Sequence, residues 1–205
     1  MTIKPILFNT EMVRAILDGR KTCTRRICKD ANEYTVPDME FYNADKRTYA
    51  VHNFADKKHT EQLSIAERTC PICPGDILYV RETWKKAPNG YFYYEDWQRD
   101  DIADVAKWKP SIHMPKEAAR IWLKVTDVKV ERLQNIDGKG CVKEGIEEEP
   151  LKHVGEDFVK GMFHDLWDST INKSDIDRYG WGANPWVWVI EFERCKKPEE
   201  DKRCD

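Results

Sequence analysis

Positive charge is concentrated in one short stretch near the start of the sequence, residues 18–26, which read DGRKTCTRR. Like charges nearby disfavour the charged form of a lysine, so we expect the pKa of Lys21 to be lowered. A lysine with a lowered pKa can act as a general base on a hydroxyl such as that of Thr24. The same cluster could instead bind a phosphate or carboxylate without catalysis, or form a solvated turn. The candidate ligand-binding residues of the stretch are Arg20, Thr22, Arg25 and Arg26.

The relation between Lys21 and Thr24 depends on the backbone. In a fully extended strand these two side chains point to opposite faces, because successive residues alternate. Shared chemistry therefore requires a bend where the chain leaves the preceding helix.

Three other places carry side chains that could line a site. Glu82 and Trp84 lie on a predicted strand, where Glu82 could pair with a cation of the first stretch and Trp84 could stack on a base. His113 lies between two prolines, on a rigid segment where it could form a pocket wall. Glu144 lies at the end of a predicted helix, where an acid opposes the helix dipole, so it is a candidate functional carboxylate. These residues also have structural interpretations. Glu82 could belong to a buried ion pair, Trp84 could be a core residue and His113 could be a structural hydrogen-bonding histidine. The acids near Glu144 could be solvated charge.

The seven cysteines are irregularly spaced, which indicates reduced thiols rather than a disulfide framework. Cys70 and Cys73 have metal-ligand spacing, and Cys23 and Cys28 could complete a four-thiolate zinc site. The spacing of Cys23 and Cys28 is not that of a standard zinc knuckle, so unbound thiols are favoured. We expect neither a metal nor another cofactor.

Composition and charge limit the classes of function. A hydrophobic fraction of 40% and a charged fraction of 35% are typical of a soluble globular protein, and the longest apolar runs are too short to span a membrane. Residues 1–29 hold seven lysines and arginines against two acids, whereas residues 144–205 hold 16 acids against nine bases. Such a local positive field suits a small anion or a single nucleotide better than a long nucleic acid. The N-terminus lacks the features of a signal peptide, so we expect a cytoplasmic protein.

Hydrophobic periodicity predicts the elements that position these residues. Residues 10–17 form an amphipathic helix that Thr10 can cap and Gly19 ends. The pattern predicts a turn at 74–76, strands at 77–84, 121–133 and 185–194, and helices at 137–144 and 158–167. Several strands with few helices between them indicate an α+β fold, a small mixed β-barrel with flanking helices. We expect one domain over 1–205, with insertions at about 27–73 and 85–107.

Several ordered motifs resemble one known family. The segments PILFNTEMVRAILDGRKTCTRR, PGDILYVRETW, KPSIHMPKEAARIWLKVTDVKVERLQNI, KEGI and NPWVWVIEF are similar to the ASCH domain, in the larger form found in phages and prophages. The helix followed by GRKTxTRR is the specific part of this resemblance. Both insertions fall outside it.

The resemblance implies a PUA-like fold with a cleft suited to RNA or a nucleobase. Some small bacterial ASCH proteins are amidohydrolases that remove the acetyl group from 4-N-acetylcytidine without a metal. Their lysine, threonine and glutamate correspond by motif to Lys21, Thr24 and Glu144. Other members are reported as ribonucleases or proposed as RNA-binding modules.

We therefore expect the chain to bind a nucleoside, nucleotide or short RNA near Lys21. Hydrolysis of an acylated cytidine is the leading enzymatic hypothesis. The alternatives are a non-catalytic reader of RNA or modified bases, and a ribonuclease. An interaction protein that acts on a host factor would fit a phage-type protein, but no residue argues for it.

Overall fold

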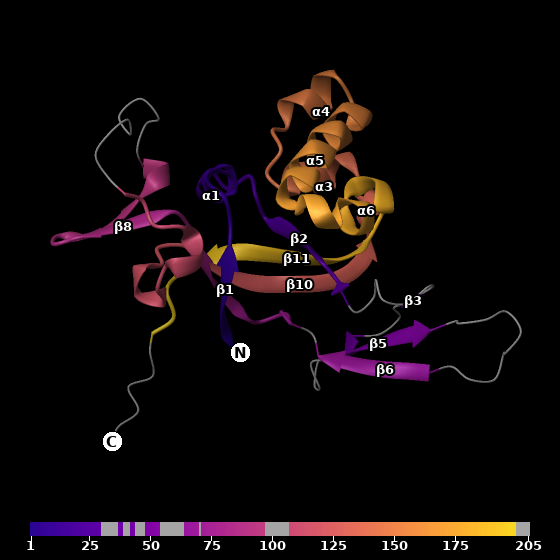
Figure 1. Cartoon of the computed structure of the whole chain (residues 1–205), viewed down its shortest axis with the longest axis horizontal. Coiled ribbons are helices and arrows are strands. Elements are labelled where there is room, and N and C mark those ends of the chain that lie inside the picture. The colour runs from indigo at the N-terminus through magenta and orange to yellow at the C-terminus, as the bar shows by residue number, and fades with distance from the viewer. Residues whose placement is uncertain are drawn as a thin grey trace, which may run out of the picture.

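The centre of the molecule is a five-stranded sheet (Figure 1). The computed structural model describes residues 1–29, 37–38, 42–43, 48–53, 64–69, 71–96 and 107–199. Across the sheet the strands follow the order β1 (Ile3–Leu7), β7 (Ile77–Arg81), β10 (Trp122–Arg132), β11 (Trp186–Cys195) and β2 (Cys23–Ile27). The α+β class and the strands expected at 121–133 and 185–194 are confirmed.

The two ends of this sheet are strands that are neighbours in the sequence. β1 pairs in parallel with β7, and β2 pairs antiparallel with β11. No ladder joins β1 to β2 in the described part of the chain, so the sheet is open where the predicted barrel would close. The long strands β10 and β11 form the middle of the sheet and carry its most extensive pairing.

Helices lie against this sheet. α1 (Thr10–Leu17) follows β1, and its N-cap is Asn9, whose side chain accepts a hydrogen bond from the Met12 N–H; the expectation that Thr10 caps it is wrong by one residue. A second group packs together on one side in Figure 1. It comprises α3 (Gly138–Lys143), α4 (Glu149–His153), α5 (Glu156–Thr170) and α6 (Ile176–Tyr179).

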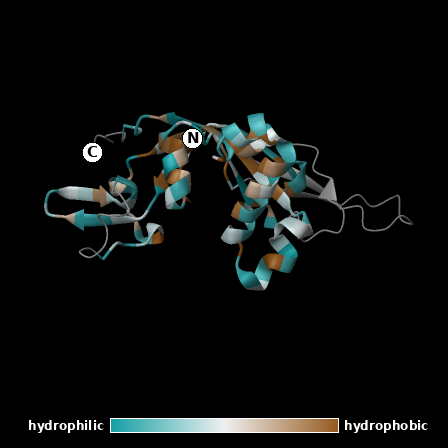
Figure 2. Ribbon diagram, turned by 90° about the horizontal axis from the view of Figure 1, so that it is seen from above, coloured by the Kyte–Doolittle hydropathy of each residue, from teal (hydrophilic) through white to brown (hydrophobic). Residues whose placement is uncertain are grey.

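Apolar side chains from these helices fill two cores. One core joins α1 to the sheet through residues such as Val13, Ile16 and Leu123. The other joins α5 to the sheet through residues that recur every four positions, Val159, Phe163 and Trp167. Phe158, expected on the same apolar stripe, is 51% exposed, because it lies one position before this row. Hydrophobic and hydrophilic residues are accordingly mixed along the helices in Figure 2.

The segment around residues 27–73 contains a small sheet of its own. β5 (Thr48–Asn53) pairs with β6 (Ser64–Thr69), and two short strands, β3 (Pro37–Asp38) and β4 (Tyr42–Asn43), also pair with β5. The sequence predicts an insertion over this segment. Its role as an insertion stays a prediction.

The predicted strand over 77–84 is in fact two strands in different sheets. β7 ends at Arg81, and Trp84 begins β8 (Trp84–Ala87), which forms a hairpin with β9 (Gly90–Tyr93). β9 lies within the stretch 85–107, where the sequence predicts an insertion. None of the helices in the described ranges is both long and apolar enough to cross a membrane.

Candidate functional site

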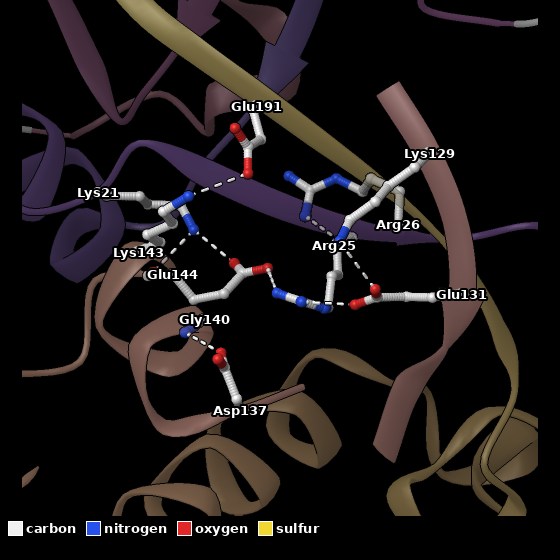
Figure 3. A network of polar contacts seen from close by, with 10 residues as sticks. All are labelled: Lys21, Arg25, Arg26, Lys129, Glu131, Asp137, Gly140, Lys143, Glu144 and Glu191. Atoms are coloured by element: carbon white, nitrogen blue, oxygen red, sulfur yellow. Dashed lines mark hydrogen bonds and ion pairs between the residues drawn. The ribbon is translucent and has the colours of Figure 1, made fainter. Parts of the chain in front are cut away.

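A buried group of charged side chains joins the first cationic stretch to the end of α3 (Figure 3). The Lys21 Nζ atom donates hydrogen bonds to the Glu144 Oε2 atom and to the Glu144 main-chain oxygen, both at 2.7 Å. The Arg25 Nη1 atom donates to the other carboxylate oxygen, Oε1, at 3.1 Å. The exposed fractions of the side chains are 0% for Lys21, 5% for Arg25 and 4% for Glu144. One carboxylate thus lies between two cations, shielded from water.

Further ion pairs extend this group across the sheet. The Arg25 Nη2 atom donates to the Glu131 Oε1 atom at 2.7 Å, and the Lys129 Nζ atom lies 3.1 Å from the Glu131 Oε2 atom. The side chain of Arg25 therefore links the carboxylates of Glu144 and Glu131. We call the five residues Lys21, Arg25, Lys129, Glu131 and Glu144 the polar network.

Two glycines bring Lys21 and Glu144 together. Gly19, with φ +79°, ends α1, and the Lys21 N–H then donates to the Ala15 oxygen at 2.9 Å. Gly145, with φ +107°, follows Glu144, and a Cβ atom at this position would lie only 2.9 Å from the Ala15 Cβ atom. The end of α3 can approach α1 this closely because residue 145 has no side chain.

Glu144 occupies the C-cap of α3, as the sequence predicts. A carboxylate at this end of a helix is unfavourable, because it faces the negative end of the helix dipole. The contacts with Lys21 and Arg25 offset this cost. The helix begins at Asp137, whose carboxylate accepts a hydrogen bond from the Gly140 N–H at 2.7 Å.

Burial of Lys21 is the main reason why its pKa is lowered. The Glu144 carboxylate acts in the opposite direction, and the positive charge of Arg26 adds a smaller lowering effect. The expected direction of the shift is confirmed. Removal of Lys21 from water contributes most to this shift, and the like charge that the sequence suggests as its cause contributes less.

A pocket of about 360 Å³ lies beside Arg25, between α3 and one face of the sheet. The Arg25 Nε atom is buried and has no hydrogen-bond partner among the described residues, so one donor of the polar network is unsatisfied. At Gly140 a Cβ atom would lie 2.9 Å from the Ile136 Cγ1 atom and 3.0 Å from the Asp137 Oδ1 atom, so the first turn of α3 has no room for a side chain there. The other charged residues of the lining are Lys129, Glu131, Asp137, Lys139, Lys143 and Glu191.

The other residues expected in the first stretch have different surroundings. The Arg20 Nη1 atom donates to the Gly145 oxygen at 2.7 Å. Thr22 is exposed, and its main chain connects the end of α3 to β11. No hydrogen bond joins Thr24 to Lys21 or Glu144 within the described ranges, and its place next to Arg25 in β2 points its side chain to the opposite face.

The candidates from other parts of the chain are not in contact with the polar network. Glu82 forms a two-pronged ion pair with Arg120, with hydrogen bonds of 2.9 and 2.8 Å, so its expected pairing with a cation of the first stretch is wrong. Trp84 is buried, with the Lys109 Nζ atom 5.1 Å from the centroid of its ring. His113 is exposed in a short 3-10 helix, Ser111–His113.

The cysteines of the proposed zinc set are separated. Cys23 belongs to the core under α5, whereas Cys28 and Cys73 belong to the core under α1. Cys70 lies outside the described residues. Within those ranges, no three or more histidine, cysteine, aspartate or glutamate side chains gather as metal ligands.

Sequence reasoning missed the contributions of Glu131, Lys129, Lys143 and Glu191. The Lys143 Nζ atom lies 3.1 Å from the Glu191 Oε1 atom, which ties α3 to β11. Lys129 and Glu131 alternate on β10, which indicates a common face, but nothing in the sequence says that this face meets Arg25.

Comparisons with known proteins give one structural likeness. No family model matches the chain, and no curated protein matches it. The chain is similar to the high-resolution crystal structure of an ASCH domain from Lactobacillus crispatus JV V101, with 8% identity over 94% of this chain and 79% of that one and a TM-score of 0.40. That structure is of the family that the sequence motifs resemble. At this TM-score the likeness carries no argument about the site or its chemistry.

Replacing Glu144→Gln should strongly destabilise the fold. The amide keeps the shape of the side chain but leaves the charges of Lys21 and Arg25 buried without their shared anion. We expect the free energy of unfolding, measured by urea denaturation, to fall by about 3–5 kcal/mol. The matched control is Glu147→Gln at an exposed position, which should change it by less than about 0.5 kcal/mol. Equal losses in the two variants would contradict the assigned role of Glu144.

The lowered pKa of Lys21 should also make stability depend on pH. Between the folded-state pKa and the usual value of 10.5, the unfolded chain binds a proton that the folded chain has lost. The contribution of Lys21 to stability therefore rises with pH across this window and is lost as pH falls through the folded-state pKa. We expect the wild type to gain free energy of unfolding relative to Lys21→Met as pH increases from neutral toward this usual value.

Urea denaturation of both proteins at a series of pH values measures this gain. Taking the difference between the two curves removes the contribution of groups that both proteins share, such as the Cys23 thiol, whose pKa burial raises to about 12. A difference that stays flat or decreases with pH would show that Lys21 is not the group responsible.

Proposed function

We propose that the chain binds a nucleoside or nucleotide in the pocket beside Arg25. The observation that carries this proposal is the Arg25 guanidinium, which two carboxylates hold at the wall of a pocket of about 360 Å³ and whose buried Nε donor has no partner among the described residues. A volume of this size suits a small ligand, and fixed polar groups in such a pocket give specificity. The motif resemblance to the ASCH domain, which implies a nucleobase or RNA ligand, agrees with it.

The lining offers the complementary groups that a nucleobase edge requires. A cytosine presents an amino donor next to ring and carbonyl acceptors. Arg25 supplies donor groups and Glu131 supplies acceptor oxygens on the same side of the pocket. Lys139 is exposed at the lining and forms no ion pair with another described residue, so it is free to bind a phosphate.

Isothermal titration with cytidine and with cytidine monophosphate tests this proposal. Lys139→Met should weaken the monophosphate by about tenfold, since it removes one charged hydrogen-bond donor, and should leave cytidine unchanged. The control is Lys173→Met, at another exposed lysine that lies outside the pocket lining. Failure of both ligands to bind at millimolar concentration, or equal effects of the two lysine variants, would refute the proposal.

The catalytic form of this proposal is removal of the acyl group from an acylated cytidine. Its support is the 2.7 Å contact between Lys21, whose pKa is lowered, and Glu144. The unprotonated form of Lys21, which its lowered pKa favours, takes a proton from a water molecule, and the water oxygen attacks the acyl carbon. The C–N bond breaks, and the proton passes through the Glu144 carboxylate to the leaving cytosine amine. The products are cytidine and the carboxylic acid.

In this form of the proposal, water replaces Thr24 as the nucleophile. The side chains of Lys21 and Glu144 are closed off from solvent, so the reaction requires the pair to open toward the pocket when substrate binds. Arg25 would then hold the developing oxyanion with its unsatisfied donor.

Incubation with 4-N-acetylcytidine, followed by chromatography of the released cytidine, tests the catalytic form. Lys21→Met should abolish release while thermal denaturation still shows a folded protein, and Lys173→Met should retain full activity. Lack of cytidine release by the wild type at micromolar enzyme would refute hydrolysis of this substrate. The binding proposal would still be tested separately, by the titration with cytidine and cytidine monophosphate.

A further inference from the structure

On the open side of the sheet, the hydrogen bonds of β1 and β2 to their neighbouring strands show which residues direct their main-chain groups outward. The Cys28 N–H bonds the Trp186 oxygen and the Thr22 oxygen accepts from the Phe192 N–H, so even-numbered residues of β2 face β11. The odd-numbered residues of β2 therefore direct their main-chain groups away from the sheet, toward β1. The same reasoning from the Thr2 and Phe8 hydrogen bonds shows that the odd-numbered residues of β1 also face outward.

Arg26 bridges these two edges at one point. Its Nη1 atom donates to the Arg25 oxygen at 3.1 Å, and its Nη2 atom donates to the Leu7 oxygen on β1 at 2.9 Å. The guanidinium carbon lies 5.2 Å from the centroid of the Phe8 ring. A side chain thus makes the connection that main-chain pairing makes elsewhere in the sheet.

A pocket of about 490 Å³ lies at this gap. Its lining comes from β1, β2, α1 and the end of α5, and it holds two arginines and no acid. The apolar part of the lining includes Ile6, Phe8, Met12, Ile27, Ile72 and Trp167. This is a separate opening from the pocket between α3 and the sheet, although Arg25 contributes to both.

Arg26 differs from Arg25 and Arg120 in its partners. Arg25 and Arg120 each hold carboxylates at hydrogen-bond distance. Arg26 forms no ion pair with any residue in the described ranges, and it donates hydrogen bonds to the main-chain oxygens of Arg25 and Leu7. Arg26 is an exposed residue, although burial of its guanidinium by the surrounding atoms lowers its pKa. A guanidinium at the mouth of an apolar pocket that lacks acids is complementary to an anion with an apolar body.

We propose that this gap binds a small amphipathic carboxylate, with its apolar body in the pocket and its carboxylate on the Arg26 guanidinium. A planar guanidinium matches a carboxylate with two parallel hydrogen bonds. An additional β-strand fits this gap less well, because Pro5 lies on the outward edge of β1 and has no N–H to donate. The proposal is independent of nucleoside binding, since it concerns a different pocket and a different ligand.

Isothermal titration with octanoate, octanol and octylammonium tests it. These probes share one apolar chain and differ in charge. We expect octanoate to bind the wild type at least about tenfold more tightly than octanol, with octylammonium weakest, because only octanoate gains charge-assisted hydrogen bonds. Arg26→Met should remove the preference for octanoate and leave the affinity for octanol within about twofold.

Two further variants make the result specific to the gap. Arg194→Met is the matched control, because Arg194 is an exposed arginine that also donates to a main-chain oxygen, that of Leu17, but lies outside this pocket. It should bind octanoate like the wild type. Thr170→Trp places a large ring on the exposed rim of the lining and should weaken octanoate and octanol alike.

Equal binding of octanoate and octanol, an unchanged octanoate affinity in Arg26→Met, or no binding of octanoate would each overturn the proposal. Displacement of octanoate by cytidine monophosphate would also overturn it, because the two ligands would then share one site. If octanoate binds as expected while cytidine and its monophosphate do not, the proposed function fails and this inference stands.

Discussion

The structure depends on one carboxylate that is buried between two cations. Glu144 neutralises Lys21 on one side and Arg25 on the other, and none of the three side chains has appreciable contact with water. Burying any one of these charges alone would be costly, so the three must be buried together. Because they come from the segment that follows α1, from β2 and from the end of α3, this requirement fixes where those three elements meet. The pocket beside Arg25 exists because the elements are held there.

Alternation along β2 gives two neighbouring arginines opposite roles. Arg25 points toward α3 and joins two carboxylates, which hold its guanidinium in one place. Arg26 points toward β1 and bonds only main-chain oxygens, so its charge is not neutralised by a neighbouring acid in the described part of the chain. One short strand thus presents a fixed cation to one pocket and an uncompensated cation to another. The different roles of Arg25 and Arg26 explain why positive charges lie so close together in residues 18–26.

Much of this arrangement could be predicted from local patterns, and the rest could not. The helix before Gly19, the strands of the central sheet and the position of Glu144 at a helix end follow from periodicity and capping signals. The motif resemblance to the ASCH domain predicts that Lys21 and Glu144 belong to one site. Contacts between residues far apart in the sequence cannot be predicted from local patterns. No local pattern indicates that Glu82 pairs with Arg120, or that Glu131 pairs with Arg25. Thr24 shows the same limit, because its side of the strand depends on the register with β11.

The order of strands in the sheet has a consequence for the synthesis of the chain. β2 emerges from the ribosome before β7 and β10, yet within the described sheet it pairs only with β11, where residues 23–27 lie opposite residues 187–191. Its strand partner is therefore translated only after the other strands of this sheet. Until then β2 has exposed edges, and Arg25 lacks Glu144, which lies 119 positions further along the chain. The site consequently assembles late, and nascent chains pass through a long interval in which an unpaired strand is available to other chains or to chaperones.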